Sequence, residues 1–166
     1  MRLGLERFLW SGAFALCACG STPPPASQAS PMLDVVVPNF ESKTLGGTAF
    51  DSGKFYERPL VVSFASPDCA ACDRSLRAAQ SLYGDVHDVV VLGVFRDAET
   101  EDALSMKSRD GLKFPIIVDT SGALTRRFKV AEVPKTFVAD RNGRVHWVGG
   151  PELTEDGLAA AVDTVR

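Results

Sequence analysis

The sequence predicts an α/β protein in which a central mixed sheet carries helices on both faces. Continuous apolar runs recur along the chain, and such runs suit strands that are covered on both faces. Segments with helical periodicity or helix-capping signals lie between them. Near the C-terminus, an Asn-Gly turn signal joins two strands directly as a hairpin, so antiparallel as well as parallel neighbours are expected.

Five segments are predicted to form the sheet, and a smaller hairpin precedes them. In this N-terminal hairpin, over residues 44–50, Gly46 and Gly47 supply the turn. The first strand of the sheet, 60–64, begins after Pro59 and is apolar throughout except for one serine. The other strands are expected at 89–94, 114–118, 134–139 and 144–148.

Four helices are predicted between and after these strands. In the first helix, Cys72, Leu76, Ala79 and Tyr83 recur at intervals that place them on one buried face. In the last helix, Thr154 is suited to capping the N-terminus. The helices are expected at 69–83, 97–109, 121–128 and 153–165.

Composition excludes one class of partner. The net charge is −3 and the basic residues form no block, so no nucleic-acid partner is expected. Hydrophobic residues make up 45% of the chain, which is enough for one domain with a substantial core. We expect this domain over residues 32–166 and expect it to be a monomer.

The first 18 residues are predicted to be a lipoprotein signal peptide. Two arginines precede the apolar run 8–18, which is too short to span a bilayer but has the length of a signal-peptide core. The sequence Leu16-Cys17-Ala18-Cys19 resembles the bacterial lipoprotein cleavage box, which implies that Cys19 is lipidated and anchors the protein to a membrane. A plain secretory signal is the alternative.

Residues 19–31 are rich in proline, serine and alanine and lack apolar periodicity. This composition predicts a disordered, partly extended tether between the lipid anchor and the domain. The expected location is the bacterial cell envelope, facing the periplasm. Gly20, the residue after the anchor, is compatible with the outer membrane by analogy with enterobacterial sorting.

The four cysteines divide into two pairs. Cys17 would leave with the signal peptide and Cys19 would carry lipid, so Cys69 and Cys72 are the only thiols expected in the mature domain. One close pair is no structural disulfide framework. The two histidines are isolated in sequence, so no metal site is expected either.

Cys69 and Cys72 follow an apolar strand and open a predicted helix. The first cysteine is then near free backbone N–H groups and the positive end of the helix dipole, both of which favour the reactive thiolate. The two-residue spacer brings the second sulfur close enough to close a small disulfide ring. The pair therefore predicts reversible thiol–disulfide exchange.

From residue 33 to 165 the chain resembles the thioredoxin-like superfamily, in particular the TlpA/ResA type of exported thiol–disulfide oxidoreductase, which is related to the redoxin (AhpC/TSA) proteins. Besides the C-x-x-C, the resemblance rests on Val133-Pro134 about sixty residues downstream. It also rests on the run 134–143, similar to the family pattern P-x-T-F-x-x-D-x-x-G, and on 89–118, similar to the strand–helix insertion of exported members.

The resemblance implies a role for each site residue. Cys69 would be the nucleophile and Cys72 the resolving thiol. Pro134 would be cis and pack beside the cysteines, and the backbone of Val133 would pair with an extended substrate segment. No cofactor is implied.

The resemblance also implies the partners and the direction of the reaction. The substrates would be disulfides of exported proteins, apocytochrome c among them, and a membrane thiol transporter would donate electrons. The protein would act as a reductant, because the similar members are reducing.

The sequence departs from the family pattern around the cysteines. Asp68 stands where thioredoxins have Trp, and its carboxylate is expected to oppose thiolate formation at the first cysteine. Arg74 is a candidate to offset this effect. Ser63 and Ser75 replace acids that handle protons in thioredoxins and in TlpA/ResA-type proteins. Another group or water would then handle the proton of the second cysteine, and these residues do not determine the redox potential.

Two other functions fit part of the sequence. A peroxiredoxin-like thiol peroxidase would need the pattern P-x-x-x-[ST]-x-x-C, in which Ser66 fits but Val62 replaces the proline. A non-catalytic or copper-binding adaptor with the same fold is the second alternative. Such copper sites usually combine C-x-x-x-C with a distal histidine, whereas His146 is expected on the surface of a strand.

Overall fold

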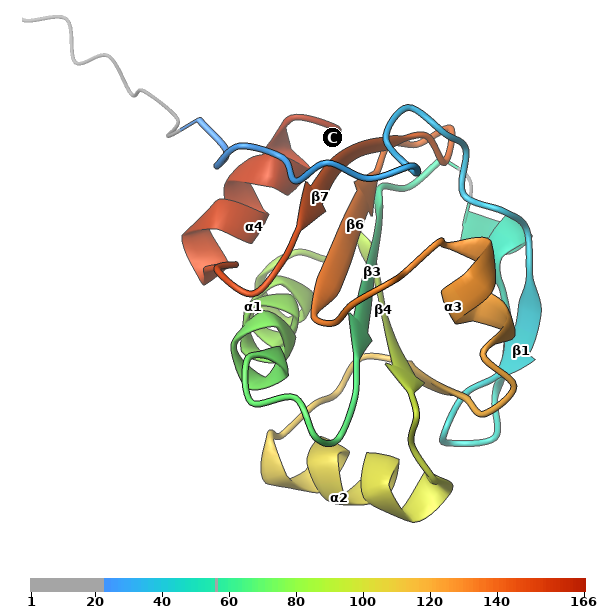
Figure 1. Ribbon diagram of the computed structural model, residues 1–166. Helices are drawn as coiled ribbons and strands as arrows, with labels where there is room; N and C mark the ends of the chain where they lie inside the picture. The colour runs from blue at the N-terminus through green and yellow to red at the C-terminus, as the bar shows by residue number, and fades with distance from the viewer. Residues whose placement is uncertain (1–22, 56) are drawn as a thin grey trace, which may run out of the picture.

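The computed structural model describes residues 23–55 and 57–166. At its centre lies a five-stranded mixed sheet in the order β5-β4-β3-β6-β7 (Figure 1). Each of the five strands predicted from the sequence is present, so the predicted mixed sheet is confirmed. The strands are β3 (Leu60–Ala65), β4 (Val90–Arg96), β5 (Ile116–Asp119), β6 (Lys135–Ala139) and β7 (Val145–Gly149).

Strand direction determines where the site residues meet. β3, β4 and β5 run parallel, whereas β6 runs antiparallel to β3 and β7 antiparallel to β6. All six residues of the central strand β3 are buried, which explains its nearly continuous apolar sequence. Because β6 runs against β3, the end of β3 lies beside the start of β6, where Phe64 pairs with Lys135.

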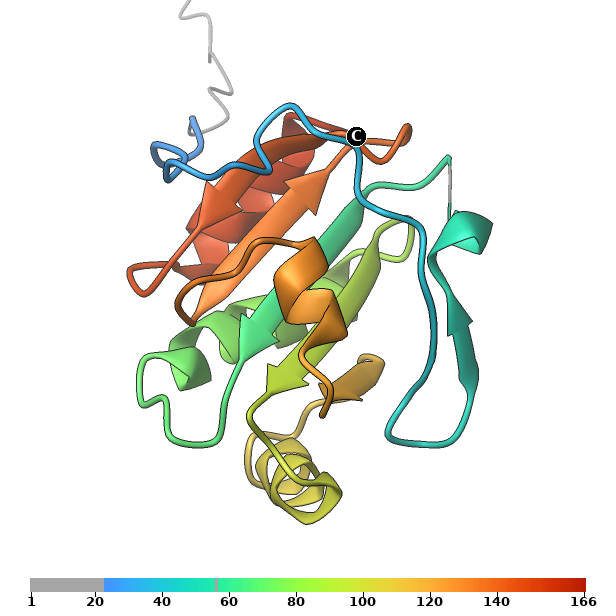
Figure 2. The same cartoon turned by 45° about the vertical axis from the view of Figure 1, so that its right-hand side comes forward.

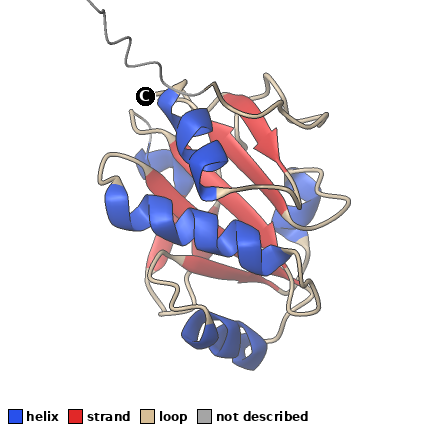
Figure 3. Ribbon diagram, turned by 90° about the vertical axis from the view of Figure 1, so that its left-hand side faces the viewer, coloured by secondary structure: helices blue, strands red, loops and turns tan. Residues whose placement is uncertain are grey.

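One face of the sheet is covered by α1 (Cys72–Asp85) and α4 (Glu155–Asp163), which lie side by side (Figure 3). Leu76 and Leu158, both 0% exposed, belong to the apolar cluster beneath these two helices. The helix of the insertion, α2 (Thr100–Arg109), buries Ala103 and Met106 in the same cluster. The predicted N-cap of α4 is confirmed, since the Thr154 side chain accepts a hydrogen bond from Gly157 N.

The other face is covered by α3 (Ala123–Arg127) and by the hairpin of β1 (Glu41–Lys43) and β2 (Ala49–Asp51) (Figure 2). A short 3-10 turn, η1 (Ser52–Phe55), follows this hairpin and was not predicted. Aromatic rings form much of the core on this face: Phe64 contacts Phe128 and Phe137 at centroid distances of 5.2 and 5.8 Å. Helices on both faces are thus confirmed.

The first helix begins later than the sequence predicts. We expected it to start at Cys69, but α1 starts at Cys72. The preceding residues form tight turns instead, in which Cys69 N donates to Ser66 O at 3.3 Å and Cys72 N to Cys69 O at 2.9 Å. Such turns are common before helix N-termini, and the apolar pattern begins only at Cys72, so it does not show whether residues 69–71 are helical. At its other end the pattern is wrong for Tyr83, which is 37% exposed.

The described part of the predicted tether, residues 23–31, lies against the domain. Gln28 N donates to Val148 O at 2.8 Å, and Trp147 Nε1 donates to Pro25 O at 2.8 Å. Because β7 is an edge strand, this contact covers backbone groups that would otherwise face solvent. This stretch is therefore docked on β7, contrary to our expectation of a disordered tether, because hydrogen bonding to a sheet edge needs no apolar periodicity.

The predicted signal peptide, residues 1–18, and the predicted lipidation site Cys19 lie outside the described residues. Within residues 23–55 and 57–166, no helix is both long enough and apolar enough to span a membrane.

Candidate active site

A disulfide joins Cys69 and Cys72, whose Cα atoms lie 5.3 Å apart. Cys69 lies in the turn between β3 and α1 and is partly exposed. Cys72 is the first residue of α1 and is 0% exposed. A substrate can therefore reach Cys69 but not Cys72, which is the asymmetry needed for one attacking and one resolving sulfur.

The peptide bond between Val133 and Pro134 is cis, as the family resemblance implied. Pro134 directly precedes β6, and the turn that carries Cys69 directly follows β3, so both lie at the same end of the sheet (Figure 1). Val133 and Cys69 are partly buried side chains that pack against the same apolar cluster. The fold thus brings the predicted site residues together from positions about sixty residues apart.

The charged residues near the dithiol do not pair as we expected. Asp68 is exposed and has no hydrogen-bond or ion-pair partner among the described residues. Arg74, the candidate to offset Asp68, instead donates to Pro151 O at 3.2 Å and lies 3.4 Å from a carboxylate oxygen of Glu152. Arg74 is therefore held by the loop after β7, and its contacts give no sign of compensation for Asp68.

Hydroxyl groups occupy the buried positions where the family has acids. Ser63 Oγ on β3 lies 2.9 Å from Thr136 Oγ1 on β6, and both residues are buried. Ser75, one turn after Cys72 on α1, is 1% exposed. Its Oγ is the one buried side-chain oxygen or nitrogen without a hydrogen-bond partner within the described ranges. Where the family pattern has acids, these two buried positions therefore carry neutral hydroxyl groups.

Lys135 is a buried cation that our sequence analysis did not single out. It follows Pro134 directly and is 9% exposed, and its Nζ donates to Gln28 Oε1 at 2.9 Å and lies 3.7 Å from Glu132 Oε1. A lysine at the start of a predicted strand, directly after the motif proline, was the available signal. Its partner Gln28 could not be foreseen, because it lies in the supposed tether.

His146 lies at the end of the sheet opposite the cysteines. It is exposed and bonds to Asp140 Oδ2 at 2.8 Å, beyond the end of β6 that is far from Pro134. Burial raises the pKa of Asp140, but hydrogen bonds from His146 and from the backbone N–H groups of Arg144 and Asn142 outweigh it, so this pKa lies below its ordinary value. A copper site that combines His146 with the dithiol has no support in this arrangement.

Comparison with known proteins agrees with this geometry. The model of the AhpC/TSA family matches residues 34–148. The thiol–disulfide oxidoreductase ResA of Geobacillus thermodenitrificans is 22% identical over 131 residues, which cover 78% of this chain and 75% of that protein. ResA of Bacillus thuringiensis subsp. konkukian is 28% identical over 111 residues, which cover 65% and 64%, respectively.

Among solved structures, a secreted disulfide oxidoreductase of Mycobacterium tuberculosis, homologous to E. coli DsbE, has the same fold. It superposes with a TM-score of 0.70 at 24% identity, over 75% of this chain and 95% of that one. The matched family model, the ResA relatives and the shared fold all agree with the observed geometry, in which the dithiol and the cis proline lie at the same end of the sheet. The chain therefore belongs to the AhpC/TSA family, as a thioredoxin-like thiol–disulfide oxidoreductase of the TlpA/ResA type.

Proposed function

We propose that this protein reduces disulfides of exported proteins through the Cys69–Cys72 dithiol. One observation carries the proposal: a partly exposed and a fully buried cysteine form one disulfide at the end of β3, at the same end of the sheet as the cis proline. The names of the ResA relatives support the exchange chemistry. The secreted relative of known structure supports an exported setting.

The reaction proceeds by two exchanges. The Cys69 thiolate attacks one sulfur of the substrate disulfide, so that a mixed disulfide forms and the other substrate sulfur leaves and takes up a proton. Cys72 then loses its proton and attacks the Cys69 sulfur, which releases the second substrate sulfur as a thiol. The substrate gains two electrons and two protons, and the Cys69–Cys72 disulfide forms again. A membrane thiol transporter returns the electrons by the reverse exchange.

Val133 and Pro134 form the proposed substrate contact. The backbone of Val133 pairs with an extended substrate segment, and Pro134 offers an apolar surface beside the attacking sulfur. Unfolded or extended exported proteins, such as apocytochrome c, suit this mode of binding because they present their backbone groups. Lipid on Cys19 would anchor the domain to a bacterial membrane, so that the domain faces the periplasm. Gly20, the next residue, is compatible with anchoring in the outer membrane.

Trapping experiments test the proposal. A Cys72→Ala variant cannot resolve the mixed disulfide, so an exported protein should stay attached to Cys69 and be released by reductant. The Cys69→Ala variant is the matched control and should trap far less, because Cys72 is buried. Equal trapping by both variants would contradict the assigned roles.

Two further measurements separate the alternatives. Redox titration of the dithiol tests the direction: a potential close to that of strong periplasmic oxidants, about −120 mV, would argue against a reductant. Rapid single-turnover reaction of Cys69 with hydrogen peroxide would instead favour the peroxidase, for which Ser66 is in place but the upstream proline is not.

A further inference from the structure

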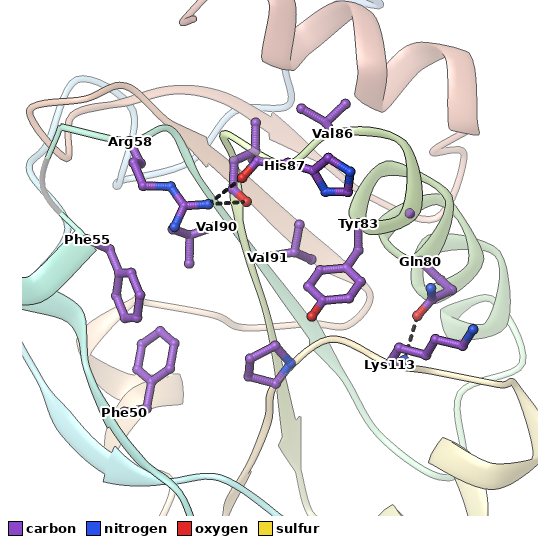
Figure 4. Close-up of a pocket in the computed structure, with 13 residues that line it drawn as sticks. Phe50, Phe55, Arg58, Gln80, Tyr83, Val86, His87, Val90, Val91 and Lys113 are labelled. Atoms are coloured by element: carbon purple, nitrogen blue, oxygen red, sulfur yellow. Dashed lines mark hydrogen bonds between the residues drawn. The ribbon is translucent and has the colours of Figure 1, made fainter.

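A hollow lies at the end of the sheet away from the dithiol. It has a volume of about 510 Å³ and is lined by thirteen residues from β2, η1, α1, β4 and the segments before β3, β4 and β5 (Figure 4). α1 spans the distance between the two regions, since Cys72 begins the helix and Tyr83 lies near its end, about 17 Å further along the axis. The hollow is therefore separate from the site of disulfide exchange.

The walls of the hollow are mainly aromatic and aliphatic. On one side Phe50 and Phe55 stack with ring centroids 4.9 Å apart. From α1, the ring of Tyr83 faces this pair across the hollow, and Val90 and Val91 lie between the two sides (Figure 4). Flat aromatic rings on opposite sides suit a flat or acyl apolar body.

The charge of the lining has one sign. Arg58 and Lys113 are among the thirteen residues, and none of the thirteen is acidic, although the whole chain has a net charge of −3. The guanidinium of Arg58 donates to His87 O at 2.8 Å and to Val89 O at 3.3 Å. Carbonyl groups orient this guanidinium but do not neutralise its charge, so it keeps its attraction for an anion.

Lys113 adds to this positive potential. Its backbone N–H donates to Gln80 Oε1 at 2.6 Å, and this hydrogen bond joins the segment before β5 to α1. Its Nζ has no acidic partner in the described part of the chain. A neighbouring hollow of about 330 Å³ adds Lys107 and shares five residues with the first: Phe50, Phe55, Tyr83, Lys113 and Pro115. The two together make an elongated apolar site with basic residues on its rim.

We propose that this hollow binds an amphipathic organic anion. Its apolar body would lie between Phe55 and Tyr83, and its carboxylate or sulfonate would lie near Arg58. This binding activity is distinct from disulfide exchange, and no cysteine takes part in it. The volume, within the range of about 300–1,000 Å³ typical of ligand sites, suits a small molecule.

The test uses 2-naphthalenesulfonate as a probe, with the neutral 2-naphthalenemethanol as its matched partner. In titrations of the purified full chain followed by amide chemical shifts, the sulfonate should bind saturably and shift the amides of Phe55, Tyr83 and Val90. The neutral analogue should bind at least about fivefold more weakly, because it lacks the attraction to Arg58. Shifts centred on Cys69, equal binding of both probes, or no saturation would each overturn the proposal.

Variants locate the binding. Lys113→Glu should weaken sulfonate binding about fivefold, since it reverses one charge on the rim, and Tyr83→Ala should weaken both probes by removing an aromatic wall. Arg127→Glu, an exposed change of the same charge on α3, is the control and should leave binding unchanged. If Lys113→Glu and Arg127→Glu weakened sulfonate binding equally, the attraction would be a general effect of the net charge, and the proposal would be overturned.

Discussion

Ser63 Oγ and Thr136 Oγ1 lie 2.9 Å apart across the pairing of β3 with β6, and each is buried. Neither hydroxyl has another partner among the described hydrogen bonds. A hydrogen bond between two neutral groups thus occupies the centre of the sheet on the face that α1 covers, at the position where thioredoxins keep an acid.

This pair should show strong coupling. Removing one hydroxyl, by Ser63→Ala or Thr136→Val, leaves the other buried and unpaired, and should lower the free energy of unfolding by about 1–3 kcal/mol. The double variant should lose less than the sum of the two single variants, because it leaves no orphaned hydroxyl. Urea unfolding of the four proteins measures the coupling, and additive losses would show that water satisfies the remaining group.

Replacing Ser75 with alanine should stabilise the protein. Its buried Oγ has no partner, so Ser75→Ala removes an unsatisfied polar group and should raise the free energy of unfolding by about 1 kcal/mol. Ser105→Ala, at an exposed position inside the helix α2, is a control for the substitution itself. A clear loss of stability in Ser75→Ala, measured by urea unfolding of the oxidised protein, would instead mean that the hydroxyl binds an internal water.

Asp140 should contribute to the free energy of unfolding, and this contribution should be lost at low pH. Because its pKa in the folded protein lies below its ordinary value, its contribution is present above the unfolded pKa, about 3.9, and is lost as the pH falls through the folded pKa. The difference in stability between the native chain and Asp140→Asn should therefore narrow below about pH 4. Urea unfolding at steps between pH 2 and 6 measures it, and a difference independent of pH would contradict the prediction.

The docked N-terminal segment should stabilise the domain. A chain that begins at residue 29 loses the contacts of Pro25 and Gln28 with β7, whereas a chain that begins at residue 23 keeps them. The free energy of unfolding of the shorter chain should be lower by about 1–3 kcal/mol. The fluorescence of Trp147, the one tryptophan in both chains, should shift to the red as its Nε1 becomes solvated. Identical stability and emission would show that docking contributes nothing.

The strands, their alternation with helices and the reactive pair can be predicted from the sequence alone. Residues 60–64 are predicted to form a buried strand because burial on both faces leaves few polar positions. Cys69 and Cys72 are identified by their spacing together with the apolar strand before them, and Pro134 by its resemblance to the family motif. These features depend on local geometry or on short patterns, which a linear sequence contains in full.

Tertiary structure decided which groups surround the pair. Arg74 pairs with Glu152 and not with Asp68, and Lys135 meets Gln28 from a segment whose composition predicted a free tether. The hydroxyl contact of Ser63 with Thr136 joins residues 73 positions apart. Such contacts depend on strand register, edge pairing and side-chain reach between distant segments. No local pattern contains this information, because it arises only when the sheet and its flanking segments have packed.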